Sequence, residues 1–337
     1  MIDAFMTLKP APLNAITDIQ GLKVGHASDG RAQSGVTVIT TGVAVTAAVD
    51  VRGGGPGIRE SDVLNPENLI GKADAIVLSG GSVFGLGAAD GVAALLSAQN
   101  QGIRLKPTSP AIPIVPAAVL HDLGNAGDKN WGLEPPYRQL GIEAARNASE
   151  QFALGSVGAG VGAMAGILKG GIGTASLDLG DGLIVGALVA ANPVGAVHMP
   201  DSDVFWAWPF EIDAEFGGVR PKPDQSSAID PVPDRSRLET LGRLKPGANT
   251  TLAVVAVNAD LTTSEAKRLA IMAQDGLSRA IRPCHTPFDG DVVFALATGE
   301  VKLDQGQSRG TQLARLGSAA ADCLARAIAR GVYEALR

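Results

Sequence analysis

The order of apolar and polar residues along the chain predicts strands and helices in alternation. Buried strands are expected where apolar, β-branched residues run together, over residues 75–81, 181–193, 250–259 and 291–298. Residues 36–49 have the same character but carry a Thr-Gly pair in the middle, so we expect a hairpin there. Residues 111–120 are apolar with two prolines, which favours an edge or irregular strand.

Helical periodicity follows several of these runs. Helices are expected over residues 82–100, 139–151 and 311–336, and a further helix begins after Thr262. Thr262 and Glu265 have the spacing of a capping box, in which each side chain binds the backbone N–H of the other residue. The apolar residues of that helix are Ala266, Leu269, Ala273, Leu277 and Ile281. Because strands and helices alternate throughout, we expect a single α/β domain over residues 1–337.

Composition narrows the class of protein. Glycine is abundant at 43 residues and aromatic residues make up only 4% of the chain, which suggests closely packed layers. The net charge of −6 argues against nucleic acid or an anionic membrane as the main partner. The first residues do not have the pattern of a signal peptide, and the apolar stretch before Lys169 is too broken by glycine for a membrane span. Cys284 and Cys323 then indicate free thiols in a cytoplasmic protein.

One junction in the chain has the features of a self-processing site. Residues 200–248 are polar and rich in proline, which predicts a surface loop or weakly ordered link, and Thr250 opens the next buried strand. A flexible link lets the carbonyl of Asn249 approach the Thr250 hydroxyl, while the strand holds that hydroxyl in place. From the residues alone, an ordinary loop that enters a strand is the commoner source of this pattern.

Longer sequence motifs favour the self-processing site over the ordinary loop. The stretches RGGGPGIRE, LSGGSVFGLGAADGV, PIVPAAVLHDL, GAGVGA, AANPVGAV, GANTTLAVVA and HTPFDGDVVFALAT stand in the same order as in the DmpA-like aminopeptidases. The chain resembles that family from about Ile19 to its C-terminal helix. The family comprises L-aminopeptidase/D-esterases, β-peptidyl aminopeptidases and nylon-oligomer hydrolases. The resemblance implies a four-layer α-β-β-α sandwich, similar to ornithine acetyltransferases, and a homo-oligomer, often a tetramer.

The resemblance also implies a nucleophile. Thr250 matches the residue that follows the cleaved bond, so cleavage between Asn249 and Thr250 would give a large subunit, 1–249, and a small subunit, 250–337. The freed α-amine of Thr250 has an ordinary pKa near ~8 and can act as base for its own hydroxyl. Thr251 is a competing nucleophile, but it is expected on the opposite face of the strand.

Four further residues match active-site positions of the family. Lys169 matches the active-site lysine, a cation that keeps the Thr250 amine neutral. Asn192 matches an asparagine that donates to the oxyanion. Asp289 and Asp291 match two acids of the nylon-oligomer hydrolases, where the aminopeptidases have Ser and Glu. Together with Thr in place of Ser at position 250, the acid pair favours the nylon-oligomer branch.

Three residues are candidates for the substrate pocket: His121, Ser82 and Phe84. His121 stands where the family often has an aromatic residue, and a hydrogen-bonded core histidine explains it equally well. Ser82 is not the nucleophile of a G-x-S-x-G elbow, because Phe84 stands where that motif needs glycine.

Cysteine and metal chemistries have weaker support in the sequence. Cys284 beside His285 would make a nucleophile and base, but adjacent residues of a strand point to opposite faces. The histidines do not have the spacing of metal ligands, so we expect neither metal nor cofactor. Three functions stay open: a threonine amidase for linear amide oligomers such as 6-aminohexanoate oligomers, an aminopeptidase for α- or β-amino acids, and an acyltransferase.

Overall fold

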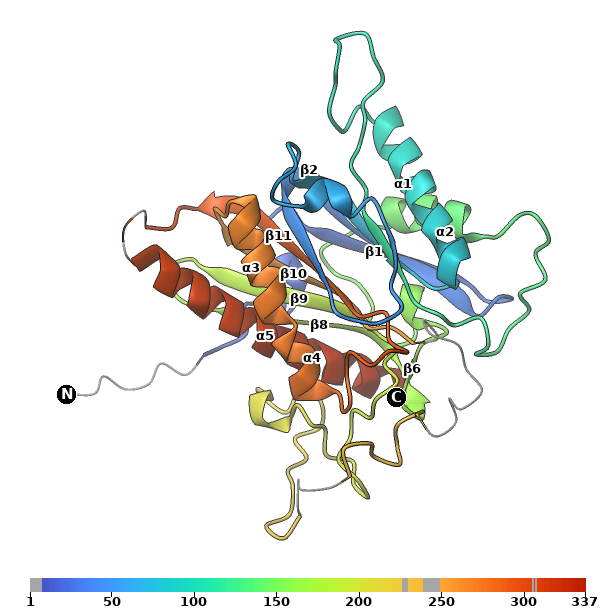
Figure 1. The fold of residues 1–337 in the computed structure, drawn as a ribbon, viewed down its shortest axis with the longest axis vertical. Helices are drawn as coiled ribbons and strands as arrows, with labels where there is room; N and C mark the ends of the chain where they lie inside the picture. Colours follow the sequence, from blue (N-terminus) through green and yellow to red (C-terminus); the bar gives the residue numbers. More distant parts are fainter. Residues whose placement is uncertain (1–7, 226–229, 239–248, 305, 307) are drawn as a thin grey trace.

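The computed structural model describes residues 8–225, 230–238, 249–304, 306 and 308–337 (Figure 1). Its main sheet is mixed, and the strands are β1 (Lys23–Asp29), β2 (Ser34–Val51), β3 (Gly57–Arg59), β4 (Lys72–Ser79), β5 (Ala117–Val119), β8 (Gly171–Asp178), β9 (Ile184–Ala191), β10 (Leu252–Ala259) and β11 (Val292–Val301). Their order is β3-β5-β4-β2-β11-β10-β9-β8, and β1 pairs with β2. A separate pair, β6 (Met164–Ala165) and β7 (Leu168–Lys169), lies outside this sheet. The prolines of 111–120 precede β5, which is short but lies between β3 and β4.

The hairpin expected over 36–49 is wrong, because these residues belong to the single long strand β2. The register of β2 against β4 shifts between Thr40 and Val45, and Gly42 has a positive φ of 68° within this irregularity. A bulge absorbs extra residues without reversing the chain. The first part of β2 pairs with β1 and its last part with β11, so tertiary pairing holds both halves in line.

Helices cover the sheet in two groups (Figure 1). The helices are α1 (Gly87–Ala98), α2 (Tyr137–Arg146), α3 (Thr263–Ala273), α4 (Asp275–Ala280) and α5 (Ser308–Ala335). Helices α1 and α2 pack on β1, β2 and β4. Helix α3 packs on β2 and β11, and α5 packs on β8 and β9. Within the described part of the chain, none of the helices has the length and apolar character needed to cross a membrane.

Strand β10 is buried on both faces. Ala253, Val255 and Val257 belong to the core cluster that includes residues of α3 and α5. Leu252, Val254 and Ala256 belong to a second cluster, shared with residues of β2 and β4. A third cluster joins the opposite face of β4 to α1 and α2. Burial on both faces explains why this strand reads as an unbroken apolar run in the sequence.

The capping box is confirmed. Thr262 Oγ1 accepts a hydrogen bond from the Glu265 N–H at 3.3 Å, and Glu265 Oε2 accepts one from the Thr262 N–H at 2.8 Å. The helix that follows is divided into α3 and α4 at Gln274, whose side chain donates to the carbonyl oxygen of Asp50 at 3.0 Å. The apolar residues expected at Ala266, Leu269, Ala273, Leu277 and Ile281 are all buried.

Glycine lets α5 lie directly on the backbone of β8. A Cβ atom at Gly173 would lie 1.9 Å from the carbonyl oxygen of Ala327, and one at Gly331 would lie 2.8 Å from the Gly173 nitrogen. These distances leave no room for side chains, so the glycines of this stretch allow close packing of helix on strand.

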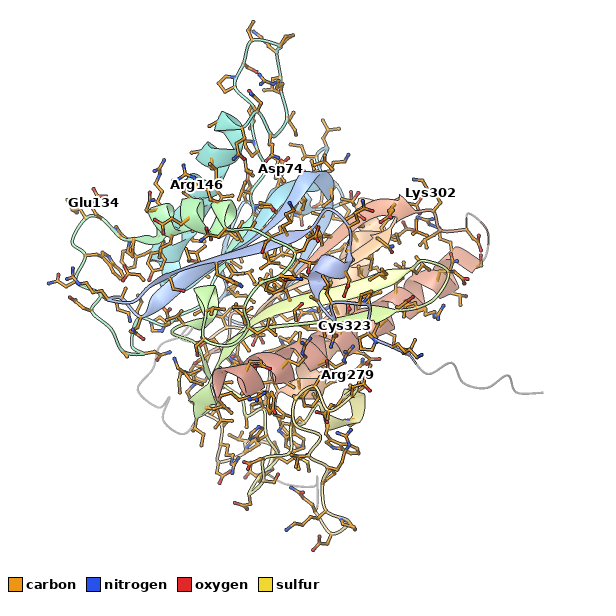
Figure 2. The ribbon with its side chains drawn as sticks, turned by 180° about the vertical axis from the view of Figure 1, so that it is seen from behind. Asp74, Glu134, Arg146, Arg279, Lys302 and Cys323 are labelled. Atoms are coloured by element: carbon orange, nitrogen blue, oxygen red, sulfur yellow. The ribbon has the colours of Figure 1, made fainter. Side chains whose placement is uncertain are left out.

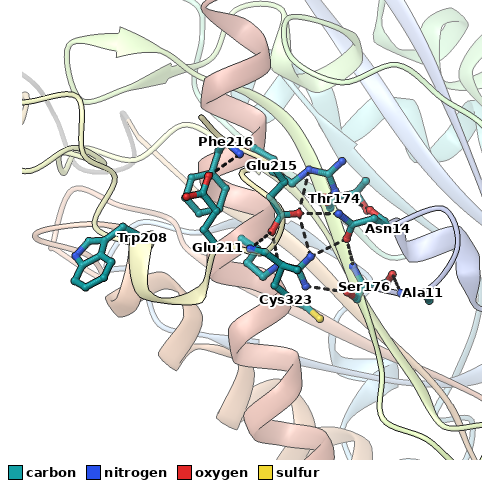
Figure 3. Close-up of polar contacts among 12 residues, drawn as sticks. Ala11, Asn14, Thr174, Ser176, Trp208, Glu211, Glu215, Phe216 and Cys323 are labelled. Carbon is teal, nitrogen blue, oxygen red and sulfur yellow. Dashed lines mark hydrogen bonds and ion pairs between the residues drawn. The ribbon is translucent and has the colours of Figure 1, made fainter. Parts of the chain in front are cut away.

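The segment after residue 200 is irregular, as expected, but it is not loosely attached. Phe205 and Phe216 are 5% and 2% exposed. Glu215 accepts from the buried guanidinium of Arg326, with an Nε to Oε1 distance of 2.5 Å, and Asn14 joins the same cluster (Figure 3). The expected link therefore packs on α5 over its first half, while residues 226–229 and 239–248 lie outside the described residues.

Figure 2 labels both exposed charged side chains and a buried thiol. The side chains of Glu134, Arg146 and Lys302 lie at the surface, whereas the thiol of Cys323 is fully buried (Figure 2). Burial raises the pKa of the Cys323 thiol to about 12. Such a thiol stays protonated and behaves as a small apolar group.

Candidate active site

The parallel pairing of β10 with β11 brings the two central motifs together. Both strands are preceded by a short stretch in which Asn249 forms a parallel bridge with Asp289. Asn249 and Thr250 are each 1% exposed, and so are Asp289 and Asp291. The bond between Asn249 and Thr250 therefore lies beside the acid pair, inside the molecule.

The carbonyl oxygen of Asn249 has two hydrogen-bond donors. Thr250 Oγ1 lies 2.5 Å from it, and the backbone N–H of Gly290 donates to it at 2.8 Å. The amide nitrogen of Thr250 donates to the carbonyl oxygen of Asn192 at 2.9 Å. The hydroxyl, the amide and the carbonyl of this peptide bond are thus each held in place.

Asp291 links the strand to a neighbouring loop. Its Oδ1 accepts from the Thr251 N–H at 2.8 Å, and its Oδ2 lies 2.9 Å from Nδ1 of His285. Burial lowers the pKa of His285, but the hydrogen bond to Asp291 and the interaction with Cys284 outweigh it and raise the pKa to about 10. His285 is therefore a cation at neutral pH, paired with Asp291.

The expectation that Cys284 and His285 point to opposite faces of a strand is wrong. Residues 284 and 285 lie in a loop and not in a strand, and His285 has a positive φ of 56°. The Cys284 side chain therefore interacts with the imidazole and does not point away from it. The ring is bound by Asp291 at the same time.

Asp289 is surrounded by donors from two segments. Its Oδ1 accepts from the Val194 N–H at 3.1 Å, and its Oδ2 accepts from the Thr286 hydroxyl at 2.6 Å and the Thr286 N–H at 3.0 Å. Burial, followed by repulsion from Asp291, raises the pKa of Asp289 to about 6 against these hydrogen bonds. Asp289 is therefore a carboxyl group that takes up a proton more readily than an ordinary aspartate.

Asn192 follows the last residue of β9 and is fully buried. Its Oδ1 accepts from the Met164 N–H at 2.9 Å, and its Nδ2 donates to the carbonyl oxygen of His121 at 3.4 Å. The side chain thus ties β6 to the segment around His121, while its main chain holds Thr250.

Lys169 belongs to the same neighbourhood. It pairs with Met164 across β6 and β7, next to the contact that Met164 makes with Asn192. Its Nζ donates to the carbonyl oxygen of Val161 at 2.7 Å, and the residue is half-buried. The structure therefore places Lys169 close to the segment that binds Thr250.

Only two of the three predicted pocket residues lie next to each other in the structure. Ser82 has a positive φ of 51°, and its N–H donates to the carbonyl oxygen of Leu120 at 2.9 Å, next to His121. Phe84 is 45% exposed and lies edge-on against Trp131, with ring centroids 5.6 Å apart. Ser82 and His121 are thus neighbours, whereas Phe84 extends this region towards the surface.

Comparison with known proteins identifies the family. The family model of Peptidase family S58 matches residues 14–337. The chain belongs to this peptidase family. It is therefore a hydrolase of amide bonds, and the resemblance to the DmpA-like family drawn from its motifs is confirmed.

Named relatives of this S58 chain fall into two groups. It is 43% identical to "Uncharacterized aminopeptidase ML1167" of Mycobacterium leprae, over 98% of this chain and 93% of the relative. It is 30% identical to the 6-aminohexanoate-oligomer endohydrolase of a Kocuria species, over 87% of this chain and 78% of the relative.

Solved structures share the fold. A Burkholderia β-aminopeptidase aligns with a TM-score of 0.68 at 23% identity, over 97% of this chain and 88% of that chain. The L-aminopeptidase D-Ala-esterase/amidase of Ochrobactrum anthropi, described as a new variant among the Ntn hydrolase fold, aligns with the same score and coverage.

The sequence reading missed Arg237, which lies upstream of the proposed cut. Its guanidinium donates to the carbonyl oxygens of Met164 and Pro193, each at 2.9 Å, and its N–H donates to that of Val194. Burial lowers the pKa of Arg237 to about 10, against the attraction of Asp289. An arginine within a polar link has no pattern that marks it, since its partners are backbone atoms distant in sequence.

A second missed group is the buried carboxyl of Asp122. It accepts from the Ser34 hydroxyl at 2.7 Å and from the Gly81 N–H at 2.8 Å, and Tyr137 donates to Ser34 at 3.1 Å. Burial raises the pKa of Asp122. This cluster fixes the loop that precedes Ser82. In the sequence, only the acidic residue next to His121 could have indicated it.

Proposed function

We propose that this S58 hydrolase matures by cutting itself between Asn249 and Thr250. The observation that carries the proposal is the 2.5 Å distance between Thr250 Oγ1 and the carbonyl oxygen of Asn249. Attack of Oγ1 on the Asn249 carbonyl carbon forms an ester and breaks the C–N bond, and the hydroxyl proton ends on the nitrogen that leaves. Water then hydrolyses the ester, which frees the amine and hydroxyl of Thr250.

In the mature enzyme the same hydroxyl attacks the substrate. The α-amine of Thr250 accepts the hydroxyl proton, since its ordinary pKa near ~8 suits a base at neutral pH. Lys169 keeps this amine neutral, and the side-chain amide of Asn192 donates to the substrate oxyanion. Asp289 and Asp291 orient the N-terminal residue, and the hydrogen bond from Thr250 N to the Asn192 carbonyl oxygen supports this arrangement.

The two subunits, 1–249 and 250–337, stay together after the cut. Strand β10 lies between β9 of the large subunit and β11 of the small one, and α5 packs on β8. Three hydrophobic clusters, with β10 and β4 each buried on both faces, support the four-layer α-β-β-α arrangement. The homotetramer implied by the family is part of the same proposal and is tested by native mass spectrometry.

The proposed substrates are linear amide oligomers such as 6-aminohexanoate oligomers. Thr250 and the Asp289–Asp291 pair support this class, as do relatives named 6-aminohexanoate-oligomer endohydrolase. The second candidate is release of N-terminal α- or β-amino acids, which is favoured by the name aminopeptidase among relatives that are more than 40% identical.

A denaturing gel and two substrates test the proposal. Purified protein should give pieces of 249 and 88 residues, and a single full-length band after prolonged incubation would contradict the cut. Hydrolysis of a 6-aminohexanoate trimer at a higher kcat/KM than an amino acid p-nitroanilide is expected. The reverse order would assign the enzyme to the aminopeptidases.

A further inference from the structure

The attacked carbonyl of the precursor already has a backbone donor. The N–H of Gly290 donates to the Asn249 carbonyl oxygen at 2.8 Å. The amide group of Asn192 is engaged elsewhere, with its Nδ2 directed to the carbonyl oxygen of His121 at 3.4 Å. Within the described residues, the donor that faces this oxygen from another segment is therefore the main chain of the Asp-Gly-Asp motif.

Charge develops on this oxygen during cleavage. As the bond from Thr250 Oγ1 to the Asn249 carbonyl carbon forms, the C=O electrons move onto the oxygen. They return when the C–N bond breaks, and the nitrogen takes the proton that the hydroxyl has lost. A donor fixed at hydrogen-bond distance stabilises such an oxyanion, and it needs no rearrangement to do so.

We propose that the backbone N–H of Gly290 is the oxyanion donor for self-cleavage, a catalytic group that the sequence motifs did not assign. This inference rests on the proposed function, because it concerns the same peptide bond. It separates the two reactions of the site: Gly290 serves the internal cut, and the Asn192 amide is kept for the substrate.

The neighbours of Gly290 hold it rigidly. The Asp289 carboxyl is bound by Val194 and Thr286, and the carbonyl oxygen of Asp289 accepts from the Gly55 N–H at 2.8 Å. The carbonyl oxygen of Asp291 accepts from the Arg52 N–H at 3.0 Å. With both flanking residues fixed, the N–H between them has little freedom to turn away.

The residue type at position 290 fits this role. A Cβ atom there would lie 2.6 Å from Thr250 Oγ1 and 2.8 Å from the carbonyl oxygen of Gly55. Glycine therefore brings an N–H to the carbonyl while leaving the hydroxyl its space. The raised pKa of Asp289, about 6, reduces the negative charge beside the oxyanion when the pH falls towards that value.

Replacing one N–H by an ester oxygen tests the inference. Incorporation of glycolic acid at position 290 removes the donor without adding a Cβ atom. The matched control is the hydroxy-acid analogue of valine at position 292, whose N–H donates to the Thr251 carbonyl oxygen at 3.1 Å in the same ladder. We expect the first-order rate of cleavage to fall by about 100- to 1,000-fold for the ester at 290. We expect about tenfold or less for the control, the effect of a typical backbone hydrogen bond.

Equal slowing by the two esters, or normal cleavage with the ester at 290, would overturn the role of Gly290. If the unmodified chain never cuts, or if Thr250→Ala still cuts, the proposed function fails instead, so the two failures are distinct.

A second measurement does not depend on cleavage. In the uncut Thr250→Ala chain, a ¹³C label on the Asn249 carbonyl should show an infrared band that moves to higher frequency when residue 290 is the ester. An unmoved band in a folded chain would show that Gly290 does not bind this oxygen.

Discussion

Asp289 and Asp291 are one residue apart, yet their carboxyl groups face different partners. Asp291 binds a cationic imidazole, whereas Asp289 accepts hydrogen bonds from neutral donors, including Val194 and Thr286. Burial and the negative charge of Asp291 therefore raise the pKa of Asp289 to about 6. The motif combines one acid bound to an imidazole with one carboxyl group that takes up a proton near pH 6.

The His285–Asp291 pair predicts a pH-dependent stability. The pKa of His285 is about 10 in the folded protein against about 6.5 in an unfolded chain. The native state thus binds more protons between these values, and stability falls as pH rises through about 10. His285→Asn in the uncut Thr250→Ala chain should lose about 1–3 kcal/mol at pH 6 and much less at pH 10.5, allowing for solvent screening. Urea unfolding at the two pH values measures this, and an equal loss at both would contradict the pairing.

The sequence motifs predicted which segments meet better than they predicted the contacts of the candidate residues. Motif matching placed Thr250, Asn192, Lys169 and the acid pair in one region, and the structure brings those segments together. It did not predict that the Asn192 amide binds backbone atoms, because those partners are brought close only by tertiary pairing. The contact of His285 with Asp291 was not predicted either, because a strand was assumed where the chain forms a loop.

Among the elements, the glycine-rich loop before β3 packs backbone to backbone on the acid motif. A Cβ atom at Gly53 would lie 2.2 Å from the Asp291 nitrogen, and one at Gly54 would lie 2.6 Å from the Pro287 Cα atom. The loop therefore supports the segment that carries Asp289 and Asp291. Its glycines are required by close approach and not by phosphate binding.

Gly53→Ala should consequently disturb the site. The added methyl group meets backbone atoms that cannot rotate away, and we expect a loss of at least about 2 kcal/mol in unfolding free energy and slower self-cleavage. Gly30→Ala is the matched control, because a Cβ atom there has nothing within 4 Å. Thermal melts of both variants in the uncut Thr250→Ala chain decide the matter. Equal melting temperatures would refute the packing argument.

The prediction of elements succeeded where one physical signal dominates. The capping box at Thr262 and the long C-terminal helix follow from local periodicity, and both are present. The Thr-Gly pair in β2 was misread because a bulge and a turn share the same residues. Only the pairing of the flanking halves with β1 and β11 decides between them, and that pairing is not local.

For the molecule as a whole, one buried ion cluster joins the two proposed subunits. Arg326 of α5 is 1% exposed and binds Glu215, Asn14 and the carbonyl oxygen of Ser176, all from residues before the cut (Figure 3). Arg330 lies 3.6 Å from the same glutamate. This cluster ties the C-terminal helix to the large subunit through charges that water does not reach.

Glu215→Ala should weaken the association of the two pieces. It leaves the Arg326 guanidinium buried without its carboxylate, which typically costs about 3–5 kcal/mol. Asp128→Ala is the control, because the ion pair of Asp128 with Arg31 is exposed and such pairs contribute little to stability. Urea titration of the cut protein, followed by size-exclusion chromatography, should separate the pieces at lower urea for Glu215→Ala alone. Identical urea midpoints of separation for the two variants would show that the Glu215–Arg326 cluster does not hold the pieces together.

The α/β class was accessible from sequence, since strands and helices alternate along the chain. The packing of residues 200–225 on α5 was not, because their polar, proline-rich composition conceals a few buried residues such as Phe216 and Glu215. Burial of that kind depends on a partner surface that forms only in the folded molecule.

The most direct test of the account is the mass of the small piece in two neighbouring variants. Intact mass spectrometry of the purified wild-type chain should reveal an 88-residue piece that begins at Thr250. Thr251→Val should still give a piece that begins at Thr250, whereas Thr250→Val should stay at the full-length mass. A piece that begins elsewhere, or cutting that persists in Thr250→Val, would contradict the assignment of Thr250 as the nucleophile.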